Sequence, residues 1–144
     1  MTNKSLQLDN QLCFALYSSS LAMTKLYKPL LAELGLTYPQ YLVMLVLWEQ
    51  DRLMVSTLGD KLYLDSGTLT PLLKRLEVAG FISRQRAADD ERRVLVHLTP
   101  SGQQLKKQAT RIPACVLQAT QCSLQTATDL TQQIKQLRSS LTAA

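Results

Sequence analysis

The chain of 144 residues has few of the features that mark membrane, secreted or disordered proteins. Its longest uninterrupted apolar run covers residues 41–48, far short of the roughly 20 residues that a membrane span needs. The first ten residues are polar and lack the apolar core of a secretory signal. Only five glycines and five prolines occur, and no segment is of low complexity, so disorder is not expected. We therefore expect a single-domain, soluble, cytoplasmic protein with no membrane partner.

Residues that commonly bind metals are scarce as well. The chain has three cysteines, Cys13, Cys115 and Cys122, and one histidine, His97. No C-x-x-C motif and no histidine pair is present, so we predict neither a zinc site nor any other metal or cofactor. Because structural disulfides are unusual in a reducing cytoplasm, the thiols are either packing residues or redox-active groups.

The positive charge of the chain is concentrated in its middle. Residues 52–111 hold 11 of the 16 basic residues and 6 of the 11 acidic ones, so the whole net charge of +5 lies there. A localised basic surface suits a polyanionic partner. On charge alone, a solvated surface without a partner is an equally good explanation.

Hydrophobic periodicity predicts a mainly helical chain with one small β-hairpin. The predicted helices cover residues 8–34, 38–50, 56–62, 66–79 and 100–122, the last bent or interrupted near Pro113, with a final helix from Thr126 or Thr128. The predicted strands are 81–86 and 93–98, joined by a long charged loop over 87–92.

Residues that commonly cap helices support several of these predicted starts. Asp9 is a candidate cap for the first helix, Thr37 with Gln40 forms a capping box for the second, and Asp65 or Ser66 caps the fourth.

Two short helices followed by a charged hairpin form the pattern of a winged helix-turn-helix. The helix over 66–79 has an apolar stripe of leucines, and its other face carries Thr68, Thr70, Pro71, Lys74 and Arg75. Such a face can read base edges in the major groove, while a basic hairpin tip reaches a minor groove. Each feature alone also fits ordinary packing or a solvated loop. Their conjunction within the basic segment predicts binding to double-stranded DNA.

These segments resemble a known family. Residues 64–77, LDSGTLTPLLKRLE, resemble the DNA-recognition helix of MarR-type regulators, and residues 89–93, DDERR, are similar to their D-x-R wing motif. Residues 9–17, DNQLCFALY, and 36–41, LTYPQY, resemble one branch, the organic hydroperoxide resistance regulators. The resemblance extends to about residue 110 and weakens in the C-terminal helices.

The resemblance implies a homodimer bound to a pseudo-palindromic operator. Residues 1–144 then form one MarR-like domain, with dimerisation helices in 1–35 and 100–144 and the winged helix-turn-helix in 36–99. Four positions match residues that meet DNA in the major groove of the family: Ser66, Gly67, Thr68 and Arg75. The resemblance also implies that Arg92 inserts into the minor groove and is held there by Asp90.

Cys13 is the candidate oxidant sensor. A thiol reacts with peroxides as the thiolate, and the positive end of a helix favours that form near the first turn. Tyr17 lies four residues on and shares the face of Cys13, whereas Tyr27 lies roughly 21 Å along a straight helix and therefore serves this thiol only from a partner chain. Tyr38 is a further candidate. The alternative is an inert, buried Cys13 with tyrosines filling a helix interface. The resemblance implies that Tyr17, Tyr27 and Tyr38 are the partners of the reactive cysteine.

The resemblance further implies a resolving cysteine in the C-terminal helices of the other subunit. Cys115 and Cys122 are both available and, seven residues apart, share one face of a continuous helix. We favour Cys122 because residues 119–124 are closer to the family segment. Gln118 stands where relatives carry cysteine, so a mixed disulfide with a small cellular thiol remains an alternative, as does packing of both thiols in the dimer core.

We thus predict a repressor, not an enzyme, that leaves its operator when an organic hydroperoxide oxidises Cys13. One alternative is a MarR-type repressor that responds to a small phenolic ligand, with Cys13 a bystander. Another is a thiol peroxidase, which leaves the basic segment unexplained.

Overall fold

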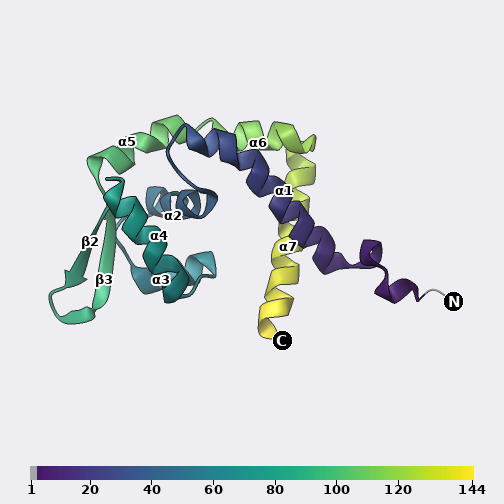
Figure 1. The fold of residues 1–144 in the computed structure, drawn as a ribbon, viewed down its shortest axis with the longest axis horizontal. Helices are drawn as coiled ribbons and strands as arrows, with labels where there is room; N and C mark the ends of the chain where they lie inside the picture. The colour runs from purple at the N-terminus through teal and green to yellow at the C-terminus, as the bar shows by residue number, and fades with distance from the viewer. Residues whose placement is uncertain (1–2) are drawn as a thin grey trace. The chain divides into compact units, whose positions relative to one another are not determined.

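The computed structural model describes residues 3–144, without the side chains of residues 90–92. It divides into two compact units, one ending at Ala109 and the other covering Thr110–Ala144, which are described separately here (Figure 1). The first unit contains η1 (Lys4–Leu6), η2 (Leu8–Asn10), α1 (Leu12–Ala32), α2 (Tyr38–Glu49), β1 (Leu53–Met54), α3 (Val55–Leu62), α4 (Ser66–Val78), β2 (Ile82–Ala87), β3 (Asp90–Leu98) and α5 (Pro100–Ala109). The second contains α6 (Ile112–Thr120) and α7 (Leu124–Ala143). The predicted fold class, mainly helical with a small β-hairpin, is confirmed.

The first helix begins later than predicted. Two short 3₁₀ turns occupy residues 4–10, and α1 starts at Leu12 instead of Leu8, with Gln11 and not Asp9 at the N-cap. Side-chain amides explain the difference, because Asn10 donates to the Lys4 carbonyl at 2.7 Å and Gln11 donates to the Ser5 carbonyl at 2.8 Å. These bonds stabilise turns in place of helix. As a result, the first turn of α1 contains Cys13.

Helix α2 lies at the centre of the first unit, as its almost entirely apolar sequence predicted. The capping box is present: Thr37 accepts from the Gln40 backbone and Gln40 accepts from the Thr37 backbone. Val43, Met44 and Leu47 are fully or almost fully buried. Burying each such side chain contributes about 1.5–3 kcal/mol, which makes α2 the anchor for the neighbouring helices.

Helices α3 and α4 approach closely through a tight turn. A Cβ at Gly59 of α3 would lie 2.7 Å from the Leu64 carbonyl oxygen, so only glycine allows this approach. Asp65 then caps α4 by accepting from the Thr68 backbone at 2.7 Å. The predicted leucine stripe of α4 is buried throughout, at Leu69, Leu72, Leu73 and Leu76. The helix-turn-helix is therefore confirmed.

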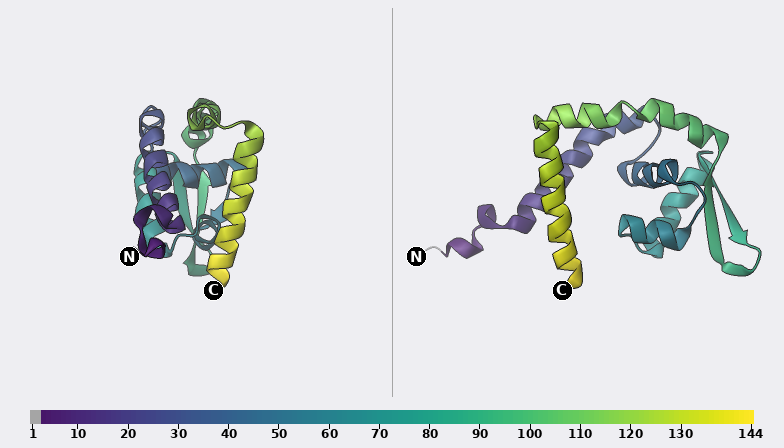
Figure 2. Two further views of the ribbon diagram at one scale, coloured as in Figure 1. Left: turned by 90° about the vertical axis from the view of Figure 1, so that its right-hand side faces the viewer. Right: turned by 180° about the vertical axis from the view of Figure 1, so that it is seen from behind.

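The sheet has three antiparallel strands in the order β1-β3-β2. Leu53 pairs with Val96, and Ile82 pairs with Leu98. Strand β1 was not predicted, because two residues are too few to show an alternating pattern. The predicted long loop is wrong: β3 already begins at Asp90, and only Ala88 and Asp89 form the turn. Figure 2 shows how far this hairpin extends beyond the helices of its own unit.

The C-terminal helices agree with the prediction only in part. The helix predicted over 100–122 is interrupted near Pro113, as expected: it consists of α5 and α6, and Pro113 lies in the first turn of α6. Helix α7 starts at Leu124, capped by Ser123 at 3.1 Å from the Thr126 nitrogen, and not at Thr126 or Thr128. Helix α6 ends at Thr120, and Gln121 has a left-handed φ of 58°. Cys115 and Cys122 therefore do not share a face of one continuous helix.

Within residues 3–144, no helix combines the length and apolar character needed to cross a membrane. Nor does the described part of the chain gather three His, Cys, Asp or Glu side chains in a way that suits a metal ion.

Candidate DNA-binding face and reactive thiol

Helix α4 presents a polar face opposite its buried leucines. Residues 66, 70 and 74 form one row along the helix and residues 67, 71 and 75 form the adjacent row, because side chains four apart share a face. Ser66, Gly67, Thr68, Lys74 and Arg75 are exposed, and Thr70 is half-buried. The structure thus brings all six predicted α4 residues to the surface. The Thr70 hydroxyl donates to the Ser66 carbonyl at 2.7 Å, so this hydroxyl is partly engaged within the helix.

The start of α4 carries a negative charge. Hydrogen bonds from the Thr68 backbone and side chain hold the pKa of the Asp65 carboxyl below its usual value. The carboxylate occupies the N-terminal end of the helix, where a DNA phosphate would otherwise be favoured. This arrangement suits contact of the α4 N-terminus with base edges, whose amino groups are hydrogen-bond donors.

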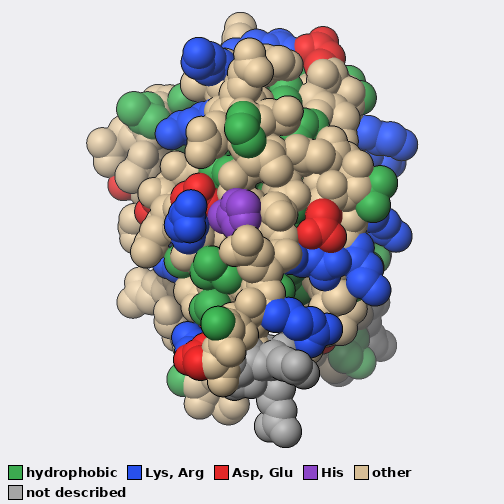
Figure 3. All heavy atoms as spheres, turned by 90° about the vertical axis from the view of Figure 1, so that its left-hand side faces the viewer, with side chains coloured by type: hydrophobic (Ala, Val, Ile, Leu, Met, Phe, Trp, Pro, Cys, Tyr) green, Lys and Arg blue, Asp and Glu red, His purple; other side chains and the backbone are tan. Residues whose placement is uncertain are grey.

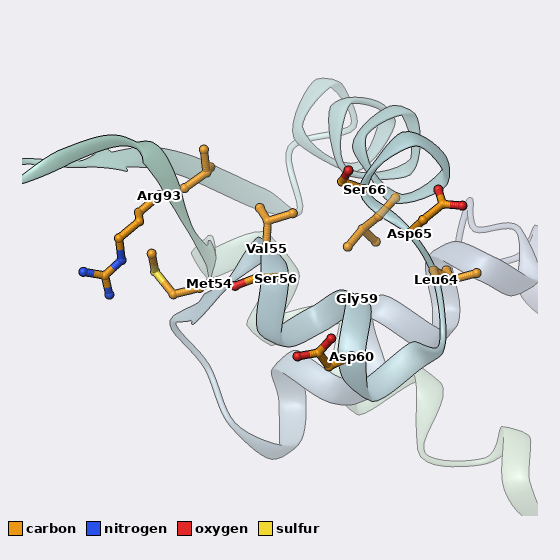
Figure 4. Close-up of a pocket in the computed structure, with 11 residues that line it drawn as sticks. Met54, Val55, Ser56, Gly59, Asp60, Leu64, Asp65, Ser66 and Arg93 are labelled. Atoms are coloured by element: carbon orange, nitrogen blue, oxygen red, sulfur yellow. The ribbon is translucent and has the colours of Figure 1, made fainter. Parts of the chain in front are cut away.

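A hollow of about 390 Å³ separates the starts of α3 and α4 from strand β3 (Figure 4). Ser56 and Gly59 of α3 lie along its floor, Ser66 and Asp65 lie on the α4 side, and Arg93 lies on the strand side. Arg93 also contacts Asp89 at 3.4 Å in the hairpin turn. Arg93 and Ser56 were not among the predicted site residues. They place additional polar groups beside the face of α4.

The hairpin is tied to α4 by one ion pair. Glu77 accepts from the Arg84 side chain and from the Arg84 backbone, both at 3.0 Å. The Arg84 guanidinium holds the pKa of the Glu77 carboxyl below its usual value. This pair fixes the hairpin of β2 and β3, the wing, against the end of α4 at its root, which is the end of the hairpin nearest the helices. The side chains of the two predicted wing residues, Asp90 and Arg92, lie outside the described residues.

Exposed basic side chains are numerous in the first unit. Figure 3 views the hairpin side of the molecule, where Lys and Arg side chains line one edge and gather toward the lower end. Among the described side chains of residues 52–109, the exposed basic ones are Arg52, Lys61, Lys74, Arg75, Arg86, Arg93, Lys106 and Lys107. Positive potential of this kind attracts the phosphates of a nucleic acid without regard to sequence.

Cys13 is exposed in the first turn of α1. Backbone N–H groups of a first helical turn lack partners within the helix and carry partial positive charge. Tyr17 lies one turn later on the same face and is 63% exposed. Within the first unit, therefore, the Cys13 thiol and the Tyr17 phenol are both uncovered and accessible to a partner molecule.

Tyr27 of α1 and Tyr38 of α2 are in contact, with ring centroids 4.7 Å apart in an edge-to-face arrangement. Tyr41, 3% exposed, lies 5.8 Å from the Tyr27 ring and 6.4 Å from the Tyr38 ring. Burial, with the nearby Tyr38 and Tyr41, raises the pKa of Tyr27 to about 12, so this phenol keeps its proton at neutral pH. Tyr41 was not among the predicted site residues, although its spacing of three from Tyr38 places both on one helix face.

The two parts of the predicted sensor do not meet within one chain. Cys13 and Tyr27 are fourteen residues apart on the same helix, which separates them by roughly 21 Å. The remaining thiols lie in the second unit. Cys115 is half-buried within α6, and Cys122 lies in the turn before α7, with its sulfur 3.6 Å from the Thr120 carbonyl.

Comparison with known proteins supports the assignment of a DNA-binding winged helix-turn-helix. Residues 25–109 match the family model described as transcriptional regulator SarA/Rot. Over 143 residues the chain is 53% identical to the organic hydroperoxide resistance transcriptional regulator of Bacillus subtilis, covering 98% of this chain and 92% of the relative. Among solved structures, reduced AbfR bound to DNA is 33% identical with a TM-score of 0.80, covering 98% of this chain and 99% of AbfR, a protein of Staphylococcus epidermidis. Disulfide-formed AbfR is 38% identical with a TM-score of 0.63, covering 93% and 94%.

The winged helix-turn-helix and these similarities define a transcriptional regulator, not an enzyme, and the thiol peroxidase alternative is set aside. The chain belongs to the MarR-type winged-helix regulators, in the branch of the organic hydroperoxide resistance regulators.

Proposed function

We propose that the chain is a dimeric, cytoplasmic repressor that leaves its operator when an organic hydroperoxide oxidises Cys13. The observation that carries the proposal is an exposed cysteine in the first turn of a helix, in a chain 53% identical to a regulator named for organic hydroperoxide resistance. The existence of a DNA-bound reduced form and a disulfide form of AbfR supports the same interpretation.

Operator binding uses α4 in the major groove. Ser66, Gly67 and Thr68, with Thr70, face the base edges, while Lys74 and Arg75 reach bases or phosphates one to two turns further along. At the hairpin tip, Arg92 enters the minor groove and Asp90 holds it in place, as in the family pattern. Two half-sites of a pseudo-palindrome then lie about 34–36 Å apart, one turn of DNA.

Dimerisation is supported by apolar side chains that the described chain leaves uncovered. Leu12, Phe14 and Leu21 are exposed on α1, and Leu130, Ile134 and Leu141 are exposed on α7. Helix α7 has no buried residue at all, although leucines and isoleucine recur along one side. Isolated helices of this kind gain most of their stability from packing, so a second copy is the natural cover.

The sensor forms only in the dimer. The phenols of Tyr27 and Tyr38 reach Cys13 from the partner subunit, while Tyr17 contributes from the same helix turn. A phenol that keeps its proton donates a hydrogen bond to a thiolate, and the raised pKa of Tyr27 ensures that state. The thiolate sulfur attacks the terminal peroxide oxygen, which yields a sulfenic acid at Cys13 and releases the alcohol after proton transfer.

A second thiol then condenses with the sulfenic acid, forming a disulfide and releasing water. We assign this role to Cys122 of the partner subunit. Cys122 lies in the turn between α6 and α7, directly before the N-cap Ser123, whereas Cys115 is built into α6. A thiol in a turn moves more easily to meet a second thiol than one fixed in a helix. A small cellular thiol takes this role if neither cysteine reaches.

Mass spectrometry of the oxidised protein tests the thiol assignments. The reduced protein is treated with one equivalent of cumene hydroperoxide as wild type, Cys115→Ser and Cys122→Ser. We expect an intersubunit Cys13–Cys122 disulfide in wild type and Cys115→Ser, and a sulfenic acid at Cys13 in Cys122→Ser. A disulfide that persists in Cys122→Ser and disappears in Cys115→Ser would contradict the assignment of Cys122.

Operator selection tests the DNA-binding face. A random DNA library should yield a pseudo-palindrome, and Lys74→Ala should reduce the slope of log affinity against log salt by about one. Glu49→Gln, on the helix behind this face, removes a charge without touching DNA and serves as the control. Equal slopes for Lys74→Ala and wild type would remove Lys74 from the interface.

A further inference from the structure

The only tryptophan of the chain connects two helices that are far apart in sequence. The Trp48 indole on α2 donates from Nε1 to the carbonyl oxygen of Gly102 on α5, at 2.9 Å. On its other side, the Trp48 ring lies edge-on to Tyr41, with ring centroids 6.4 Å apart. Trp48 therefore contacts both the tyrosine cluster and the start of α5.

The tyrosine side of this contact reaches the candidate sensor. Tyr41 packs against both Tyr27 and Tyr38, the two phenols that we assign to the partner's thiol. Because all three rings are packed together, a shift of Tyr27 or Tyr38 displaces Tyr41 and with it the face against which Trp48 lies.

The other side reaches the root of the wing. A Cβ at Gly102 would lie 2.1 Å from the Phe81 carbonyl oxygen, so the start of α5 is pressed against the residue that precedes β2. The Phe81 carbonyl accepts from the Thr99 nitrogen at 3.1 Å, and the Phe81 nitrogen donates to the Leu76 carbonyl of α4 at 3.0 Å. A movement at Gly102 is therefore transmitted to the end of α4 and to the start of the hairpin.

Trp48 also has room to move. A hollow of about 280 Å³ lies beside its ring, lined further by Leu47, Asp51, Leu98, Gln103 and Lys106. Close-packed side chains transmit a shift, whereas adjacent free space permits a second arrangement. The indole has both kinds of surroundings.

We propose that Trp48 is a positioning residue that couples the state of the tyrosine cluster to the placement of α4 and the wing. In the reduced protein, the tyrosine cluster and the start of α5 are both in the DNA-binding arrangement, and the hydrogen bond from Trp48 to Gly102 links the two without being needed to hold that arrangement. When oxidation of Cys13 withdraws the thiolate from Tyr27 and Tyr38, the cluster shifts and Trp48 carries that shift to Gly102. This inference rests on the proposed sensor function.

Intrinsic fluorescence tests the first part directly, because every tryptophan photon comes from Trp48. One equivalent of cumene hydroperoxide is added to operator-free wild type and to Cys13→Ser. We expect a change in the emission maximum or intensity in wild type that develops with the oxidation of Cys13, and no change in Cys13→Ser. Unchanged emission in a wild-type protein that does release DNA would overturn the inference and leave the proposed function intact.

Operator affinity of Trp48→Phe tests the second part. The phenyl ring keeps an aromatic side chain beside Tyr41, and it removes the N–H donor together with one ring of the indole. Met44→Leu, a volume-conserving change one turn earlier on α2, is the matched control. We expect both variants to bind operator like wild type when reduced. Since the loss of one hydrogen bond corresponds to about a threefold to tenfold effect, oxidised Trp48→Phe should bind operator about threefold to tenfold more tightly than oxidised wild type.

These outcomes distinguish failure of the role assigned to Trp48 from failure of the proposed sensor function. An unchanged ratio of oxidised to reduced affinity in Trp48→Phe would overturn the role of Trp48. Equal loss of reduced binding and oxidised binding in Trp48→Phe would show a structural role only, and would overturn the inference as well. Wild type that stays on DNA after oxidation would instead refute the proposed function.

Discussion

Replacement of Gly102 by alanine should destabilise the first unit more than any other glycine-to-alanine change within a helix of that unit. The new Cβ would lie 2.1 Å from the Phe81 carbonyl oxygen and 3.0 Å from its carbon, so backbone has to move. Overpacking of this kind costs about 1–3 kcal/mol. The Phe81 carbonyl also accepts from Thr99, and the Gly102 carbonyl accepts from Trp48. Weakening both bonds adds about 1–2 kcal/mol.

Helix propensity offsets part of this cost, because alanine is about 1 kcal/mol better than glycine inside a helix. The net loss is about 1–4 kcal/mol, a large share of the roughly 5–15 kcal/mol that is typical of a folded domain. Gly67→Ala on α4 is the matched control, since its Cβ would meet only an Asp65 carboxylate oxygen at 3.4 Å.

Urea unfolding followed by circular dichroism, at one fixed protein concentration, measures the difference. With a slope of about 2 kcal/mol per molar urea, Gly102→Ala should lower the midpoint by about 0.5–2 M. Gly67→Ala should leave it near or above the wild-type value. A Gly102→Ala midpoint equal to that of Gly67→Ala would refute the packing argument at the root of the wing.

Three further predictions follow from single contacts. Arg84 lowers the folded-state pKa of Glu77, so the ion pair stabilises the protein at pH values above the ordinary pKa of 4.5, and this stabilisation is lost as pH falls through the lowered pKa. Glu77→Gln should therefore reduce the free energy of unfolding by about 0.5 kcal/mol at pH 7 and by much less at pH 3. Urea unfolding at both pH values measures the difference, and an equal cost at both would contradict this prediction. Arg52→Gly should raise stability by about 0.5–1 kcal/mol, because Arg52 adopts a φ of 61° that glycine tolerates better; a lower melting temperature would count against it. Tyr27→Phe should slow oxidation of Cys13 by about tenfold, the effect of losing one charge-assisted hydrogen bond, as measured by stopped-flow loss of free thiol, and an unchanged rate would remove Tyr27 from the sensor.

The winged helix-turn-helix could be predicted from sequence because its signals are local. The leucine stripe of α4, the Asp65 cap and the Thr37–Gln40 capping box each lie within one helix, where periodicity and spacing determine the outcome. Four residues of the α4 face followed from the same stripe, since they occupy the side opposite the leucines: Thr68, Thr70, Lys74 and Arg75. Ser66 and Gly67 rested on the family resemblance.

The errors arose where a short segment depends on contacts that periodicity does not report. Strand β1 has two residues and exists because Leu53 and Met54 pair with β3, far along the chain. The late start of α1 depends on side-chain amides of Asn10 and Gln11 that satisfy carbonyls six residues earlier.

The candidate sensor likewise combines residues that local sequence patterns indicate with residues that only contacts between helices reveal. The choice of Cys13 and of three tyrosines rested on sequence spacing and resemblance, whereas Tyr41 and Trp48 belong to the cluster through packing between helices. The Trp48 bond to Gly102 spans 54 residues. No local pattern indicates a contact at that separation.

Operator affinity before and after stoichiometric cumene hydroperoxide, for wild type and Cys13→Ser, tests the central claim most directly. The account predicts that both reduced proteins bind the selected operator and that the oxidant releases wild type alone. Operator binding by wild type that is unaffected by oxidation, or release of Cys13→Ser to the same extent, would contradict the assignment of Cys13 as the sensor.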